Sequence, residues 1–161
     1  MHRQLLIALT MIVILLAANG TTTAQNSQRD NLKDIGPLDL IIDGLQPDLE
    51  RYQLTRAMLQ TVVEDRLDEH GMSLSKTADP YIYLNVNSFA INEDLYAYSI
   101  DLQVNTSVTI VETGQVAIAT IWSIAALGRV SAARLPTILS DVLNQVDKLA
   151  NDYVAVNPIQ P

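Results

Sequence analysis

The chain of 161 residues contains no cysteine, and this absence excludes several kinds of chemistry at once. Disulfide bonds, thiolate metal sites, thiol catalysis and lipid attachment to an N-terminal cysteine all require the missing side chain. A single domain of ordinary size buries enough apolar surface to fold without crosslinks. We therefore expect one domain that is held together by its hydrophobic core.

Histidine is also scarce, since only His2 and His70 occur. His2 lies in an N-terminal segment that is expected to be removed, so a Ser–His–Asp triad would have to use His70. His70 precedes Gly71 at the end of a predicted helix, where a cation interacts favourably with the helix dipole, and we interpret it as a capping residue. The sequence contains neither a Gly-rich, Lys-containing phosphate loop nor a dinucleotide-binding fingerprint. We predict no catalytic residue and no cofactor.

Acidic residues cluster just before His70, and their spacing does not match a calcium-binding loop. The cluster consists of Glu64, Asp65, Asp68 and Glu69. A helix end provides poor geometry for surrounding a cation, so we interpret the cluster as a solvated face and predict no metal site. Paired carboxylates for glycoside hydrolysis are available among 18 acidic residues, but none lies in a context that indicates a cleft.

Basic residues are few: 10 Lys and Arg stand against 18 Asp and Glu, which gives a formal net charge of −8 at pH 7. Loss of Arg3 with the N-terminal segment would leave 9 basic against 18 acidic residues. No basic cluster interrupts this pattern. Such a chain repels phosphate backbones and anionic lipid surfaces, so nucleic-acid binding is not expected.

Only one long apolar run occurs, the 14 residues Leu5–Ala18, which is short for a bilayer span. Arg3 precedes the run, and small or polar residues follow it. This order is typical of a secretory signal peptide, predicted over residues 1–24 with cleavage after Ala24. Cleavage after Gly20 and an uncleaved anchor are the alternatives. We expect a protein exported to the periplasm or the extracellular space, with no transmembrane segment after cleavage.

Residues 25–36 are polar and aperiodic, and they are predicted to form a flexible leader. The single domain is predicted over residues 37–157, followed by a tail at 158–161. Its first strand is indicated by the alternation of Leu38, Leu40 and Ile42 with Asp39, Ile41 and Asp43.

Two helices are predicted from apolar residues at spacings of three and four. The first begins at Pro47, or alternatively uses Thr55 as its N-cap, and ends at Gly71. Its stripe comprises Met58, Leu59, Val62, Val63, the stem of Arg66 and Leu67. The second helix begins near Leu135-Pro136 and ends at Asn157-Pro158. Its stripe comprises Leu135, Ile138, Leu139, Val142, Val146, Leu149, Ala150 and Tyr153.

Between the helices, the nearly regular alternation of apolar and polar residues and two turn signals predict three antiparallel strands joined by two hairpins. If Phe89 pairs with Leu95, the first hairpin pairs Ile82 with Leu102, Leu84 with Ile100, and Val86 with Tyr98. A three-residue loop, Glu112-Thr113-Gly114, closes the second hairpin, with Gly114 in the left-handed conformation. This loop pairs Ile110 with Val116, Val108 with Ile118, Thr106 with Thr120, Val104 with Trp122, and Leu102 with Ile124.

The resulting order, β-α-β-β-β-α, predicts a two-layer α+β sandwich with a mixed four-stranded sheet. An antiparallel meander and a first strand reached by a crossover make up the sheet, and both helices cover one face. That covered face carries Ile82, Leu84, Leu102, Val104, Ile118 and Trp122. Trp122 is therefore interpreted as a core residue rather than a binding residue.

The opposite face of the meander is predicted to be open, and Asp101 is the only charged residue among its assigned positions. Those positions are Tyr81, Tyr83, Asn85, Asn87, Phe89, Leu95, Ala97, Ser99, Asp101, Gln103, Asn105, Ser107, Thr109, Gln115, Ala117, Ala119 and Ile121. An open antiparallel face is ordinarily just solvated, but weak charge and two tyrosines also match interface composition. The candidate binding surface is Tyr81, Tyr83, Asn85, Asn87, Asp101 and Gln103. Arg129 and Arg134, before the last helix, would either contact an anion or remain solvated.

Over about residues 38–155, this order of elements resembles small periplasmic α/β sandwich proteins of the bacterial envelope. LptE-like lipoproteins of the lipopolysaccharide translocon and TolB amino-terminal domains are examples. The resemblance rests on element order and carries over no functional residue. The chain departs from the lipoprotein pattern because it has no cysteine to lipidate.

Together these features indicate an exported, non-enzymatic binding or assembly module of the cell envelope that contacts an envelope protein through the open face. One alternative is a periplasmic carrier that holds a small apolar ligand between sheet and helices. The other alternative is a hydrolase with an unrecognised site.

Overall fold

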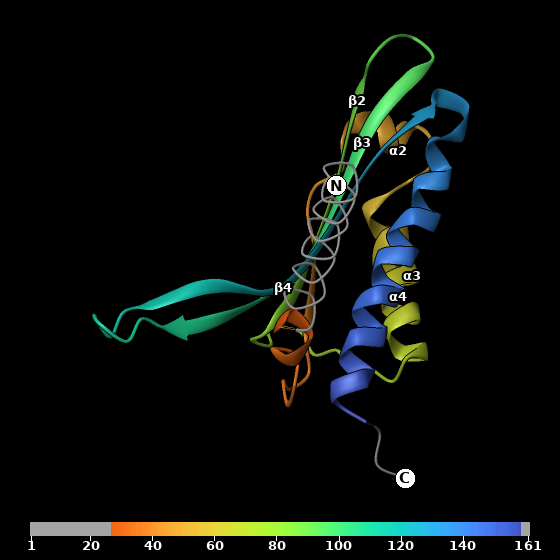
Figure 1. Ribbon diagram of the computed structural model, residues 1–161. Coiled ribbons are helices and arrows are strands. Elements are labelled where there is room, and N and C mark those ends of the chain that lie inside the picture. Colours follow the sequence, from red (N-terminus) through yellow and green to blue (C-terminus); the bar gives the residue numbers. More distant parts are fainter. Residues whose placement is uncertain (1–26, 159–161) are drawn as a thin grey trace, which may run out of the picture.

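The computed structural model describes residues 27–158, which form a helical layer packed on one face of a sheet (Figure 1). The sheet has four strands in the order β1-β2-β3-β4. Helices α3 (Arg56–Glu69) and α4 (Ile138–Val156) lie on the same side of it. The predicted α+β class and the mixed four-stranded sheet are confirmed. The predicted signal peptide lies outside the described residues.

Strand β1 (Asp39–Ile42) runs parallel to β2 (Tyr81–Ala90), as expected for a crossover connection. Strands β3 (Leu95–Thr109) and β4 (Val116–Ser131) complete an antiparallel meander with β2. The alternation that predicted β1 is confirmed, because Leu40 and Ile42 are buried while Ile41 between them is exposed.

The chain uses both of the helix starts that the sequence left open. Pro47 begins a short helix, α2 (Pro47–Arg51), and a second helix, α3, then begins after Thr55. Thr55 Oγ1 accepts a hydrogen bond from the Met58 backbone N–H at 3.2 Å, as an N-cap residue does. Gly71 adopts a φ of 75°, and its N–H donates to the Asp68 carbonyl at 2.8 Å. The predicted glycine cap is therefore confirmed.

Helix α4 follows a 3-10 turn, η1 (Ala132–Thr137), which contains Pro136. The predicted stripe of α4 is buried or partly buried throughout. On α3, Leu59, Val63 and Leu67 are fully buried, but Met58 is exposed. The core-facing stripe of α3 is therefore narrower than predicted, since one row of residues at a spacing of four meets the sheet.

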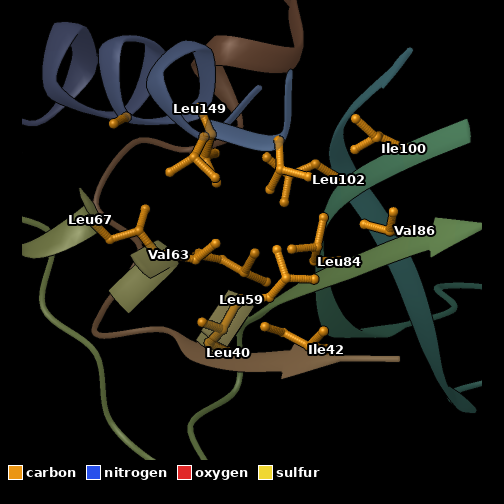
Figure 2. Packing of buried hydrophobic residues seen from close by; sticks show 14 of the residues in the cluster. Leu40, Ile42, Leu59, Val63, Leu67, Leu84, Val86, Ile100, Leu102 and Leu149 are labelled. Carbon is orange, nitrogen blue, oxygen red and sulfur yellow. The ribbon is translucent and has the colours of Figure 1, made fainter. Parts of the chain in front are cut away.

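Figure 2 shows how the two layers meet in one hydrophobic core. Side chains from all three of the neighbouring strands β1, β2 and β3 point at α3 and α4. The labelled residues are Leu40, Ile42, Leu84, Val86, Ile100 and Leu102 from the strands, and Leu59, Val63, Leu67 and Leu149 from the helices. Trp122 is also buried, and its Nε1 donates to Asp152 on α4 at 3.0 Å, which confirms its assignment to the core.

The register predicted for the first hairpin is wrong by two residues. Leu84 pairs with Leu102, and Val86 pairs with Ile100, because the strands extend to an Ala90–Tyr96 pair. A shift of two residues leaves every side chain on the same face, so the apolar pattern fits both registers equally well.

The second hairpin is predicted correctly near the core and wrongly beyond it. Val104 pairs with Trp122 as expected, but a β-bulge follows between Val104 and Asn105. Beyond the bulge the pairing is shifted by one residue, so Val108 lies opposite Ala117 instead of Ile118. Ile118 was predicted to be buried and is 59% exposed. Gly114 does adopt the predicted left-handed conformation, with a φ of 68°.

Residues 105–120, which we call the arm, lie beyond this bulge. Figure 1 shows that these ends of β3 and β4 form a two-stranded ribbon projecting away from the sheet and helices. The bulge explains the change of direction, because an extra residue in one strand bends it and increases the local twist.

The predicted flexible leader is corrected in part, because folded structure begins before Gly36. Residues 27–30 are helical, and Leu32 is fully buried in the core. The Asn31 amide donates to the Ile121 carbonyl at 3.1 Å, and the Asn157 amide donates to the Leu32 carbonyl at 2.8 Å. A single leucine in a polar segment has no periodicity, so the sequence pattern could not reveal this contact.

Candidate functional site

All six candidate binding residues belong to the face of the sheet opposite α3 and α4. On β2, the candidates alternate with Ile82, Leu84 and Val86, which are buried toward the helices. Cross-strand pairing places Tyr83 opposite Gln103 and Asn85 opposite Asp101. Tyr81 and Asn87 lie one pair further along on either side.

A hydrogen-bonded group connects part of this surface, and its centre is Asp43, which the sequence analysis did not select. The Tyr83 hydroxyl donates to the Asp43 carboxylate at 2.6 Å, and the Asn85 amide donates to the same oxygen at 3.2 Å. The Asn87 amide in turn donates to Asn85 Oδ1. We call Asp43, Tyr83, Asn85 and Asn87 the Asp43 network.

The network lowers the pKa of Asp43, chiefly because the Tyr83 hydroxyl and then the Gly44 backbone N–H donate to its ionised carboxylate. The same hydrogen bond raises the pKa of Tyr83, because the proton of its hydroxyl is held by Asp43. Asp43 therefore stays ionised and Tyr83 stays protonated near neutral pH. A charge whose acceptor positions are occupied in this way is less available to water than an isolated carboxylate.

Parallel pairing explains why Asp43 lies at this position. The Asp43 N–H donates to the Leu84 carbonyl at 3.0 Å, so β1 continues beside β2 up to the residue that precedes Gly44. The signal in the sequence was an aspartate at the end of a predicted strand. The sequence did not reveal which residues of β2 lie beside Asp43, because that depends on the register between β1 and β2.

The open face carries more charge than the candidate positions on β2, β3 and β4 indicated. Strand β1 contributes Asp39, whose carboxylate accepts hydrogen bonds from the Leu40 and Thr77 backbone N–H groups. Strand β4 contributes Arg129 opposite Ala97, because β4 continues to Ser131. Asp101 is therefore not the only charge on the sheet. The acidic side chains gather at the β1 side, and Arg129 lies on β4 at the other edge.

Two large apolar side chains border the Asp43 network on the same face. Phe89 is 64% exposed and Leu127 is 86% exposed. Their positions follow from pairing, since Phe89 lies opposite Ala97, and Leu127 lies opposite Ser99, which also pairs with Asn87. A polar network beside exposed apolar side chains matches the composition of protein interfaces.

His70 has a structural role at the contact between α3 and α4. His70 is the C-cap residue of α3, as predicted, and its Nε2 lies 3.1 Å from Asp147 Oδ1 on α4. Arg66 Nε lies 2.8 Å from the same oxygen, so the contact joins the two helices. Within residues 27–158, no group of three or more His, Cys, Asp or Glu side chains is arranged to hold a metal ion.

Arg129 and Arg134 both line a surface cavity of about 370 Å³ at the start of the last helix. Tyr98 and Asp141 lie in the same lining, and the Tyr98 hydroxyl donates to Asp141 at 2.5 Å. This hydrogen bond, with burial, raises the pKa of Tyr98 to about 12. The cavity therefore contains an acidic side chain beside the two arginines, which makes it a poor match for a simple anion site.

A second cavity of about 720 Å³ lies between β1 and α3, at the edge of the sheet. Six of its eight lining residues have polar side chains: Asp39, Gln60, Glu64, Ser75, Lys76 and Thr77, with Leu40 and Leu74 as the other two. Apolar atoms nevertheless form the larger part of the lining surface, so the cavity selects neither a polar nor an apolar molecule. Among residues 27–158, no helix is long and apolar enough to cross a bilayer.

The chain matches no protein-family model, and no curated protein matches it in sequence.

Proposed function

We propose that the chain is an exported, non-enzymatic binding or assembly module of the bacterial cell envelope, acting through the open face of its sheet. The observation that supports this function is the Asp43 network, which holds Tyr83, Asn85 and Asn87 in place on a face that the helices leave free. The proposed partner is an envelope protein.

Preorganisation is the first physical reason. The network side chains project from strands of a packed sheet and are fixed by one another, so binding would cost them little conformational entropy. The hydrogen bonds from Tyr83 and Asn85 also satisfy part of the Asp43 carboxylate before any partner arrives. The Asp43 carboxylate therefore loses fewer hydrogen bonds to water when a partner covers the face, which lowers the cost of desolvation.

The exposed apolar residues are the second reason. Phe89 offers apolar area next to Asn87 on β2, and Leu127 offers more on β4, across Ser99 from Asn87. Specific interfaces combine an apolar centre with hydrogen-bonding groups that define orientation, and this face provides both. Asp39, Asp43 and Asp101 favour a partner surface that is neutral or basic.

Export is the part of the proposal that depends on residues 1–24. The basic start, the apolar run and the small residues after it support a signal peptide. Mass spectrometry of the intact protein from the producing cell measures this directly. We expect the mass of a chain beginning at Gln25, and a chain that retains Met1 would contradict cleavage.

Site-specific photocrosslinking in the producing cell tests the binding face. A photoreactive residue replaces Gln103 on the open face, and a matched one replaces Asn144, an exposed residue of α4. We expect a defined crosslinked protein from position 103 and none from position 144. Equal capture at both positions would show that the open face is not a specific binding surface.

A second arm of this experiment uses Tyr83→Ala combined with Asn85→Asp, which removes both side-chain donors to Asp43 and adds a like charge beside it. We expect the crosslink from position 103 to be lost while the unfolding transition is retained. Asn144→Asp adds the same charge on the helix layer and should leave the crosslink intact. Persistence of the crosslink in the folded double variant would remove the network from the function.

A further inference from the structure

The arm carries almost no charge and exposes apolar side chains. Between Asp101 and Arg129 the only charged residue is Glu112, which lies in the loop at the tip of the arm. Val111 in that loop is 91% exposed, Val116 is 73% exposed and Ile118 is 59% exposed. Figure 1 shows that the arm projects away from the helices and the rest of the sheet. A two-stranded ribbon of this kind has marginal stability when it stands alone in water.

The direction of the main-chain groups in the arm follows from two hydrogen bonds. The Ile110 N–H donates to the Gln115 carbonyl at 2.8 Å, so Ile110 and Gln115 face each other across the ribbon. In an antiparallel pair, inward and outward main-chain groups alternate along each strand. Ser107 should then point outward, and its N–H does donate to the Asp79 carboxylate, at 3.0 Å. Ile118 pairs with Ser107, so the N–H and carbonyl of Ile118 point outward from the opposite edge.

The protein covers two stretches of strand edge near the arm with its own side chains. Asp79 accepts from the Thr106 hydroxyl and the Ser107 N–H, which covers the β3 edge at the base of the arm. On β4, the Asn31 amide donates to the Ile121 carbonyl, and Gln28 accepts from the Ser123 N–H. Further along β4, Arg129 provides a charge of the kind that discourages edge pairing.

The β4 edge of the arm, residues 116–120, has none of these protections. Within the part of the chain that the structure describes, no residue hydrogen-bonds to the outward main-chain groups of Val116, Ile118 or Thr120. All three are β-branched, and no charged residue lies among residues 116–120. Natural sheet proteins ordinarily protect such an edge, because it readily pairs with another strand.

We propose that this edge pairs with the same edge of a second copy of the chain, antiparallel and about a two-fold axis at Ile118. This register joins all of residues 116–120 and sets Val116 opposite Thr120 of the second copy. An identical edge is complementary to itself in an antiparallel pair, so one patch serves both copies. The inference goes beyond the proposed function and does not depend on the open face.

Charge allows a second copy to occupy this edge. The net charge of −8 makes two copies repel each other over most of their surfaces, but residues 116–120 are neutral. Because the arm projects outward, pairing through it keeps the two acidic bodies apart (Figure 1). Glu112 of one copy would lie at least about 20 Å from Glu112 of the other, since each lies beyond Gln115 and six strand residues at roughly 3.3 Å each separate the two Gln115 positions.

Disulfide trapping tests this register directly, because the chain contains no cysteine of its own. Ile118→Cys places two thiols opposite each other on the axis, at a Cα separation of about 5.5 Å that a disulfide can span. Val111→Cys places a thiol at the tip, where the side chain is more exposed than at position 118. In cells expressing the full sequence, we expect a covalent dimer from position 118 and not from position 111. Equal dimer formation from both positions, or none from position 118, would overturn the proposal.

Sedimentation analysis of the purified protein over about a hundredfold range of concentration measures the association itself. Ile118→Lys brings two charges together at the axis and should raise the dimer dissociation constant about tenfold or more. Val111→Lys adds the same charge at a more exposed apolar site and should leave the dimer intact. A monomer at every concentration, or an equal loss in both variants, contradicts strand pairing. Capture of a different protein by a monomeric chain at position 118 would also contradict a second copy as the occupant.

Discussion

The hydroxyl of Tyr83 and the carboxylate of Asp43 each change the ionisation of the other, and this gives the open face a pH dependence. Folding lowers the pKa of Asp43, so its contribution to stability is present above about pH 4 and is lost as pH falls through the lowered value. Folding raises the pKa of Tyr83, so the contribution of Tyr83 to stability is present below about pH 10 and is lost as pH rises through the raised value.

Tyr83→Phe should therefore destabilise the chain most between about pH 4 and pH 10, with a difference from the unsubstituted chain that shrinks toward both extremes. Denaturant unfolding at several pH values measures this difference, and NMR titration should show the pKa of Asp43 rising toward its ordinary value. Tyr81→Phe is the matched control, because no side-chain hydrogen bond joins the Tyr81 hydroxyl to another described residue. A difference for Tyr83→Phe that does not vary with pH would exclude the coupling.

Single residues also show which parts of the site the sequence could not reveal. Alternation along β2 placed Tyr83 and Asn85 on one face correctly, because a period of two depends only on local conformation. Asp43 was missed because its contact with Tyr83 spans 40 positions and depends on the register of a parallel pair. Hydrophobic periodicity carries no information about that register when both possible partners are polar.

In strand β4, a single glycine, Gly128, allows a side chain of β3 to pack closely against the strand. Tyr98 on β3 lies opposite Gly128, and a Cβ at position 128 would overlap the ring carbons and the hydroxyl of Tyr98. The ring therefore crosses β4 at the glycine and reaches Asp141 on α4 at 2.5 Å. Glycine at this point in a strand is explained by the close approach of a neighbour.

Gly128→Ala should displace the Tyr98 ring and lower the free energy of unfolding by about 1 to 3 kcal/mol, the usual cost of inserting a methyl group into a filled space. The hydrogen bond to Asp141 would weaken, so the pKa of Tyr98 should fall from about 12 toward 10. Ultraviolet titration and denaturant unfolding measure the two effects. Gly36→Ala is the control, because no atom lies within 4 Å of a Cβ there. An unchanged pKa of Tyr98 would contradict the displacement.

Elements whose residues all face one packed layer were the ones that the sequence predicted well. The stripe of α4 and the Val104–Trp122 pair are examples, because burial there constrains every second or every third to fourth residue. The arm was predicted poorly because a bulge moves every later residue to the other face. Ile118 and Val116 look like core residues in the sequence, and nothing local distinguishes an exposed apolar strand from a buried one.

At the scale of the whole molecule, the segment around Leu32 joins regions that are distant in the chain. Asn157 at the end of α4 accepts from the Asp34 N–H at 2.7 Å and donates to the Leu32 carbonyl at 2.8 Å. Gln28 and Asn31 contact the edge of β4. The N-terminal segment therefore adds Leu32 to the core and covers part of the β4 edge on either side of Trp122.

Leu32→Ala tests whether this segment is part of the cooperative fold. The leucine is fully buried, so its truncation should lower the free energy of unfolding by about 2 to 5 kcal/mol, through lost transfer energy and a residual cavity. Loosening of the segment should also uncover the β4 edge, so the Ser123 amide should exchange its hydrogen faster, since its acceptor is Gln28. Leu127→Ala removes the same atoms from an exposed position and should change neither quantity appreciably. If Leu32→Ala behaves like Leu127→Ala, the segment is only attached to the surface, and the domain begins near Gly36 as its sequence pattern indicates.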